Sequence, residues 1–321
     1  DVGDFALAQE FADKALQSAE ESRHAYTKAI ASALAGLVWL RRGFPGRAMP
    51  HLQRSVQGCK DAHLPLWQPV ASSLLGLALV MLDALDEALP LLEEAVVRTG
   101  ELGVKAYLAL WKTHLAEGLL AAGQKARAKV HAEEALELAI AHQERGHQAW
   151  ALRVCGDVAS QDGQHGLEAA EGYFAEALTL ARQLGARPLC ALTHLSLGRC
   201  YRRAGLNAKA EEQLTEALSL CVDMGLGLWV DRAAAELKQL GQTWIVSSDN
   251  AAFYQRLQRS LAENSTLDII LDRRQDGQEE DRQMPEQGRG PERRRLPARS
   301  SDLRMRRLAV VPQEPEPSMA A

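Results

Sequence analysis

Small residues recur every 40 residues along the first 241 positions of this chain, and this period restricts the fold more than any other feature. One series marks turns at steps of 40, 40, 40, 40 and 42 residues: Gly3, Gly43, Asp83, Gly123, Gly163 and Gly205. Another lies seven residues before a turn: Gly36, Gly76, Ala116, Gly156 and Gly198. A fixed period of this length is typical of stacked helical hairpins. The sequence therefore predicts a solenoid.

Two small positions and a filler residue follow each turn. The first small position holds Ala8, Ala48, Ala88, Ala128 and Ala210, and the second holds Ala15, Ser55, Ala95, Ala135, Ala177 and Ala217. The filler between them is Ala12, Leu52, Leu92, Ala132, Phe174 or Leu214. The fifth repeat fits only with two residues inserted near Gln164–Glu168. Antiparallel helices approach closely where one offers Gly or Ala to the bulk of the other, and glycine accepts the positive φ of the turn.

Composition agrees with an all-α fold. Apolar residues make up 46% of the chain, and Ala and Leu, which favour helices, dominate them. The pattern predicts helices over 4–20, 24–42, 46–61, 66–82, 84–100, 105–122, 125–143, 147–162, 166–184, 188–204, 207–223 and 227–240. The last is interpreted as a capping helix that Gly241 ends. We expect residues 1–241 to form a right-handed superhelical solenoid of helical hairpins.

The period is lost after Gly241. Within residues 242–272, we predict a linker over 243–247, a short helix over 251–262 and a short strand over 266–271. Residues 273–321 mix Arg, Glu, Gln, Gly and Pro with few large apolar groups, a composition typical of disorder. We therefore predict a disordered tail there.

The repeats resemble the tetratricopeptide repeat (TPR) family. The matching residues are the pairs Leu75-Gly76 and Leu197-Gly198, Tyr201 and the alanines above. The period is 40 residues where the family has 34, and the terminal Pro of the family repeat is absent. The family's Trp in the first helix is replaced by Ser32, Ser72, Lys112, Leu152 and His194.

A more specific resemblance covers residues 184–205 and 224–229. These segments are similar to the C-terminal repeats of bacterial proteins that join a class III nucleotide cyclase domain, an AAA-type ATPase and a TPR array. The resemblance implies a regulatory or sensory module at the C-terminal end of a larger cytoplasmic signalling protein. The chain also begins without Met and inside a helical pattern, so we expect it to be a fragment.

Catalytic motifs are missing from the sequence. It has no Gly-x4-Gly-Lys-Ser/Thr phosphate loop, no His-Glu-x-x-His and no Gly-x-Ser-x-Gly. Five cysteines are never closely paired and have no zinc spacing, so we interpret them as packing residues of a reduced intracellular protein. We expect no enzyme activity and no catalytic, cofactor or metal site.

Charge and hydropathy do not favour nucleic acid or membrane partners. The net charge is −5, and the tail from Arg273 onward holds 11 Arg against 9 Asp and Glu, with no aromatics among them for base stacking. No apolar run reaches the roughly 18 residues that span a bilayer. The expected partner is therefore a protein or peptide.

The TPR resemblance also implies a concave binding surface lined by the first helix of each hairpin. Early repeats place apolar residues there: Ile30, Leu37, Leu40, Val70, Leu77, Val80, Met81, Leu110 and Leu120. Later repeats place Trp150, Arg153, Asp157, Arg199, Arg202 and Arg203. Such a surface suits an amphipathic helix or an extended acidic peptide. In the alternative interpretation, long helices bury the apolar set, and Arg202 and Arg203 only end a helix against its dipole.

Three hypotheses of function remain open at this stage. The first is a protein-interaction module whose partner includes domains of its own parent protein, which would be a nucleotide cyclase or an ATPase. Another is a self-association scaffold that forms a homodimer. The third is the TPR region of an ATPase-linked transcriptional regulator.

Overall fold

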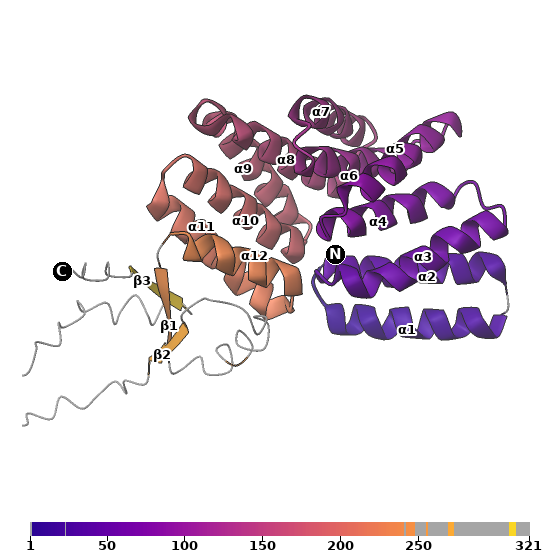
Figure 1. Ribbon diagram of the computed structural model, residues 1–321, viewed down its shortest axis with the longest axis horizontal. Helices are drawn as coiled ribbons and strands as arrows, with labels where there is room; N and C mark the ends of the chain where they lie inside the picture. Colours follow the sequence, from indigo (N-terminus) through magenta and orange to yellow (C-terminus); the bar gives the residue numbers. More distant parts are fainter. Residues whose placement is uncertain are drawn as a thin grey trace, which may run out of the picture.

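The computed structural model describes residues 2–22, 24–240, 242–247, 255, 269–272 and 308–312. In this part of the chain, twelve α-helices follow one another through short turns and one 3-10 helix, η1 Ser160–Gly166 (Figure 1). Their bounds are α1 Phe5–Ser22, α2 Ala25–Arg41, α3 Pro45–Asp61, α4 Gln68–Met81, α5 Leu85–Glu101, α6 Leu108–Ala121, α7 Lys125–Ala141, α8 Arg145–Ala159, α9 Leu167–Gln183, α10 Arg187–Arg203, α11 Asn207–Met224 and α12 Gly227–Lys238.

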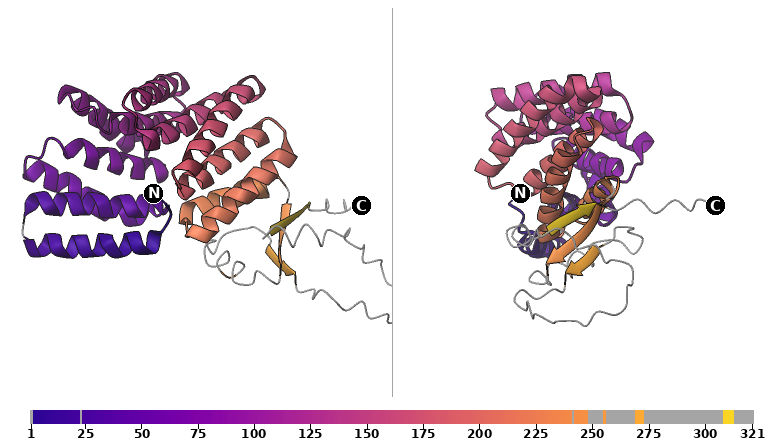
Figure 2. Two further views of the ribbon diagram at one scale, coloured as in Figure 1. Left: turned by 180° about the vertical axis from the view of Figure 1, so that it is seen from behind. Right: turned by 90° about the vertical axis from the view of Figure 1, so that its left-hand side faces the viewer.

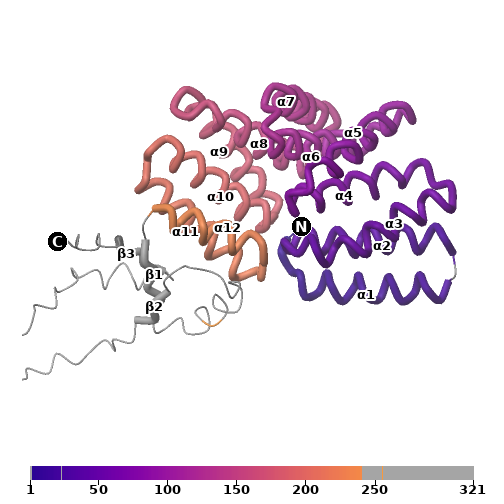
Figure 3. Tube along the Cα trace, viewed as in Figure 1, coloured from indigo at the N-terminus to yellow at the C-terminus, as the bar shows by residue number. Residues whose placement is uncertain are grey.

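The prediction of an all-α solenoid is confirmed. Every helix begins and ends within three residues of its predicted limit. Helices α2, α4, α6, α8 and α10 are the first helices of five hairpins, and each contacts the next first helix along the array (Figure 2). The second helices, α3, α5, α7, α9 and α11, form an outer layer. The tube in Figure 3 follows this path.

The small residues in the first helices are packing positions. A Cβ added at Gly36, Gly76, Gly156 or Gly198 would lie 2.5–2.6 Å from the filler side chain of the same hairpin. In the third hairpin both partners are small, because Ala116 faces a core that contains Ala132. Larger fillers thus meet glycine, and the alanine filler meets alanine. The sequence pattern thus reflects complementary side-chain volumes, because a large residue on the second helix is matched by a glycine on the first.

Turn geometry explains the series of small residues that marks the turns. Gly43, Gly123 and Gly205 have φ of 72–77°, and Asp83 adopts φ 63° at the equivalent turn. Gly163 also has positive φ, but it lies inside η1 Ser160–Gly166 with ψ −129°. This 3-10 helix accommodates the two extra residues of the fifth repeat.

The two ends of the array meet, which the sequence did not predict. Phe5 packs in one core with residues of α10, α11 and α12. The backbone N–H of Leu228 donates a hydrogen bond of 3.0 Å to the carbonyl of Gly43. Gly227 approaches Phe44 so closely that a Cβ there would lie 2.6 Å from the ring. The N-terminus accordingly lies beside α12 (Figure 1), and the array closes on itself.

Three strands follow α12 and correct part of the prediction. Residues 243–247 are not a linker, because β1 Gln242–Ser247 pairs in parallel with β2 Ile269–Asp272 and antiparallel with β3 Leu308–Pro312. The strand predicted over 266–271 is β2, shifted towards the C-terminus. β3 lies within the segment predicted as disordered, where Val310 and Val311 favour a strand. The rest of 273–321, and the helix predicted over 251–262 apart from Gln255, lie outside the described residues.

The five cysteines are free and buried, which agrees with their interpretation as packing residues. Burial raises the pKa of the Cys155 thiol to about 12 and also raises the pKa of Cys221. A thiol with a raised pKa is a poor nucleophile at neutral pH. Among the helices that the structure describes, none is both long enough and apolar enough to cross a membrane.

Candidate functional site

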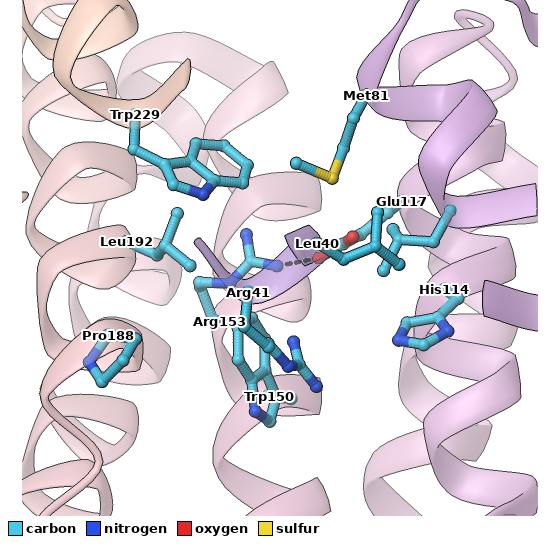
Figure 4. Close-up of a pocket in the computed structure, with 11 residues that line it drawn as sticks. Leu40, Arg41, Met81, His114, Glu117, Trp150, Arg153, Pro188, Leu192 and Trp229 are labelled. Atoms are coloured by element: carbon cyan, nitrogen blue, oxygen red, sulfur yellow. Dashed lines mark ion pairs between the residues drawn. The ribbon is translucent and has the colours of Figure 1, made fainter. Parts of the chain in front are cut away.

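A cavity lies on the inner side of the closed array, where six helices converge. Each of them contributes a side chain to its lining: Arg41 from α2, Met81 from α4, His114 from α6, Trp150 from α8, Leu192 from α10 and Trp229 from α12 (Figure 4). Its volume is about 40 Å³. A space for one water molecule needs at least about 10–15 Å³. The cavity can therefore hold a small polar head group.

One repeat position of the first helices changes its chemical character along the array. The residue directly after the small packing position is Leu37, Leu77, Glu117, Asp157 and Arg199 in successive hairpins. Its character changes from apolar to acidic to basic along the array. Closure of the array brings the charged hairpins against the apolar ones.

Arg153 is the central charge of the cavity. It is only 8% exposed, and its guanidinium forms an ion pair with Glu117 of the preceding first helix. Its Nη1 also donates to Asp157 Oδ2 at 2.8 Å. Burial lowers the pKa of Arg153; Asp157 opposes this shift, while Arg41 and Arg199 reinforce it. A second cation, Arg41, lies 4.1 Å from the ring centroid of Trp150.

Three buried polar atoms around the cavity have no hydrogen-bond partner among the described residues. They are Arg153 Nε, His114 Nε2 and Trp229 Nε1. Buried polar groups in folded proteins are nearly always paired, so three at one cavity indicate a place for a hydrogen-bonding guest. Two of them, Arg153 Nε and Trp229 Nε1, can only donate, which favours a guest that accepts.

The site residues predicted from the sequence fall into separate groups. Trp150, Arg153 and Asp157 lie together at or next to the cavity. Arg199 and Arg202 form ion pairs of 2.8 and 2.7 Å with the buried carboxylate of Glu236 in α12. Arg203 donates to Ser160 Oγ at 3.1 Å. The arginines of α10 thus anchor the capping helix and η1.

The apolar residues expected to line the groove are buried or half-buried. Leu40, Leu77, Met81 and Leu110 are buried, and Ile30, Leu37, Val70, Val80 and Leu120 are half-buried. The alternative interpretation, in which long helices bury the apolar set, describes this end of the array.

Sequence reasoning missed four residues that bring hydrogen-bonding groups to the cavity: Arg41, His114, Glu117 and Trp229. Glu117 shares its repeat position with Asp157, and this shared position could have revealed it. No signal in the sequence pointed to Arg41, His114 or Trp229, because closure of the array brings Arg41 and Trp229 together from its two ends.

Acidification should destabilise the fold through His114. This ring is buried, and Ser73 Oγ lies 2.9 Å from its Nδ1. Burial lowers the pKa of His114 well below its usual value, and Arg41, His147 and Arg153 lower it further. Below about pH 6.5 the unfolded chain takes up a proton that the folded chain refuses, so stability falls as pH falls, by up to about 1.4 kcal/mol per pH unit.

The measurement compares the parent chain with His114→Asn. Urea unfolding between pH 7 and pH 5 should show the parent losing about 2 kcal/mol more than the variant. Equal losses in both chains would contradict the assignment of the pH dependence to His114.

No protein-family model matches the sequence, and no curated protein does either. Among solved structures, a Rap protein complexed with competence and sporulation factor has a TM-score of 0.56 and 13% identity, covering 81% of this chain and 72% of its own. BtubC (BKLC) from P. vanneervenii has a TM-score of 0.47 and 19% identity, covering 69% of this chain and 92% of its own.

A third solved structure contains kinesin-light-chain-type repeats from Podosopora anserina, described as nearly identical and TPR-like. It has a TM-score of 0.43 and 15% identity, covering 60% of this chain and 94% of its own. The likeness to the Rap protein supports the fold. The chain is a TPR-like solenoid.

Proposed function

We propose that this TPR-like solenoid is a protein-interaction scaffold that recognises a carboxylate of an acidic peptide at its central cavity. The observation that carries the proposal is the set of unpaired buried atoms at Arg153, His114 and Trp229. A carboxylate supplies lone pairs for such donors, and the neighbouring Arg41 guanidinium favours negative charge. We propose no chemical reaction for this chain.

The cavity suits the acidic peptide considered from the sequence. About 40 Å³ accommodates the head of one Asp or Glu side chain. The proposed partner is an extended peptide that inserts one such side chain and lays its flanks over Arg199 and Arg203. Arg199 is 41% exposed and remains accessible beside its ion pair with Glu236.

We further propose that the scaffold is the regulatory or sensory part of a larger intracellular signalling protein, a nucleotide cyclase or an ATPase-linked regulator. The resemblance of residues 184–205 and 224–229 supports this context. One protein of the same fold was solved in complex with competence and sporulation factor, which supports a regulatory role for an array of this shape. Sequencing the gene upstream of Asp1 would test the parent protein directly.

Binding of a model acidic peptide should depend on the Trp229 indole. A fluorescein-labelled octaglutamate peptide should bind the full chain, and octaglutamine should not. Trp229→Phe keeps an aromatic ring but removes the Nε1 donor, and a hydrogen bond to a charged acceptor contributes about 1.5–3 kcal/mol. We expect the affinity for octaglutamate to fall about tenfold or more, measured by fluorescence anisotropy at low salt.

Trp67→Phe is the matched control for this experiment. Trp67 donates from Nε1 to the Tyr26 hydroxyl at 3.1 Å, away from the cavity. This variant should bind octaglutamate like the parent, and thermal melts should show both variants folded. Equal binding of octaglutamate and octaglutamine, or unchanged affinity in Trp229→Phe, would refute the proposed carboxylate site.

A further inference from the structure

The first helix of the chain has an apolar face that no described residue covers. Phe11 is 59% exposed on α1, and Ala15 is exposed one turn further along. Residues in the place of Ala15 in the other five second helices are all 0–1% exposed: Ser55, Ala95, Ala135, Ala177 and Ala217. Helix α1 therefore has the sequence of a second helix and packs on α2, but its face around Ala15 is open.

The other hairpins identify what normally covers this face. Ser55 Oγ donates to the carbonyl of Ala29 at 2.8 Å, and Ala29 belongs to α2, the first helix of the same hairpin. A Cβ added at Gly58, one turn further along α3, would lie 3.3 Å from the Ala29 Cβ. The second small position of a second helix thus rests on its own first helix.

Backbone geometry at the start of α1 is that of a hairpin turn. Gly3 has φ 96°, in the left-handed region used by Gly43, Gly123 and Gly205. The N–H of Ala8 donates to the carbonyl of Asp4 at 3.1 Å, as the N–H of Ala128 donates to Gln124 at 3.0 Å. The chain direction at Gly3 is therefore already set for an antiparallel helix on the open face.

We propose that the open face of α1 binds a helix equivalent to the first helix of a hairpin, called here a first-type helix. This helix runs antiparallel to α1 and is joined to it through Gly3. The residue of that helix opposite Ala12 is alanine. This identity follows from the complementary volumes seen inside the array, where Leu52, Leu92, Phe174 and Leu214 each face glycine, while the alanine filler Ala132 shares a core with Ala116. The proposal is independent of the carboxylate site.

A second copy of the chain fits the face less well. Two α1 helices would meet through one pair of helical faces only, whereas stable protein interfaces bury at least about 1,200 Å² in total. Inside the array, by contrast, each second helix packs on its first helix through two small positions, one on each side of the filler residue. A first-type helix on α1 would continue this interface, which favours it over a second copy.

The test grafts a first-type helix of known fit onto α1. Residues 105–122, which contain α6 and Ala116, are fused directly before Gly3 of the full chain, so that Gly3 takes the place of Gly123 and Ala116 comes opposite Ala12. Ala15→Cys reports cover of the face through its rate of reaction with a thiol reagent. The five native thiols are buried and give a low background.

Ala6→Cys is the matched control, because Ala6 lies on the exposed side of α1. Its equivalents in α3, α5 and α7 are exposed even though those helices are covered by their first helices: Gly46, Asp86 and Ala126. The graft should slow labelling of Ala15→Cys about tenfold or more and leave labelling of Ala6→Cys unchanged. Ala116→Leu in the grafted copy should abolish the protection.

Three results would overturn the proposal. The first is unchanged labelling of Ala15→Cys in the graft. Another is equal protection by the leucine graft, which would mean that volume at Ala12 does not select the helix. The last is a dimer of the unfused chain by light scattering that Phe11→Glu dissolves, since this would assign the face to a second copy.

Discussion

Replacing Gly36 with alanine should destabilise the parent chain and stabilise a chain that already carries Leu52→Ala. In the parent, the three atoms nearest to an added Cβ all belong to the Leu52 side chain, at 2.5, 2.6 and 3.4 Å. Overpacking of this kind costs about 1–3 kcal/mol. Once Leu52 is shortened, the same methyl fills space and removes a helical glycine, which together contribute about 1–2 kcal/mol.

Urea unfolding of the parent, the two single variants Gly36→Ala and Leu52→Ala, and the double variant measures whether the effect of Gly36→Ala on stability changes sign. Leu52→Ala alone should cost about 2–5 kcal/mol, because it leaves a cavity at a fully buried site. Gly172→Ala serves as control, since Gly172 lies inside α9 with nothing within 4 Å of its added Cβ. It should stabilise both backgrounds by about 0.5–1 kcal/mol. If Gly36→Ala destabilised both backgrounds, a neighbour other than Leu52 would limit the space.

Arg153→Met should cost about 3 kcal/mol or more in unfolding free energy. The change removes the cation shared by Glu117 and Asp157 and leaves two carboxylates close together at the edge of the cavity. Breaking a buried ion pair from one side costs about 3–5 kcal/mol, and the partial exposure of both carboxylates moderates this figure. Chemical unfolding at pH 7 measures the loss.

A double variant and a surface control distinguish two causes of the destabilisation: the loss of the ion pairs of Arg153 and the loss of its packing. Adding Glu117→Gln to Arg153→Met removes the repulsion, so the double variant should regain a large part of the stability. Arg127→Met breaks the exposed ion pair of Arg127 with Glu93 and should cost less than about 1 kcal/mol. A double variant no more stable than Arg153→Met would show that packing on Trp150 dominates.

Much of the fold was predictable because its rules are local. A hairpin of two helices depends on residues within one period, so Gly36 and Leu52 are recognisable as partners from spacing alone. The turn at Gly43 needs positive φ whatever surrounds it. Strand β3 was missed because its partner β1 lies far away in the sequence, and four apolar residues in a polar tail do not reveal such pairing.

The candidate site was predictable only in part. The TPR resemblance implied that Trp150, Arg153 and Asp157 lie on the inner surface, and the structure brings them together. It did not indicate the partners of Arg199 and Arg202, because Glu236 comes from the capping helix, whose place depends on the whole array. Charged residues on a predicted concave face can thus be structural as well as functional.

The amino-acid sequence by itself determined the repeat, the helices and the complementary volumes within each hairpin, since contacts over a few turns of helix decide these features. Only the tertiary structure decided that Gly43 meets Leu228, that Arg41 and Trp229 share a cavity, and that α1 keeps an open face. The physical reason is that each hairpin is rotated slightly relative to the one before it, and these rotations add up along the array. Whether the two ends meet depends on the total rotation, which the residues of a single repeat do not determine.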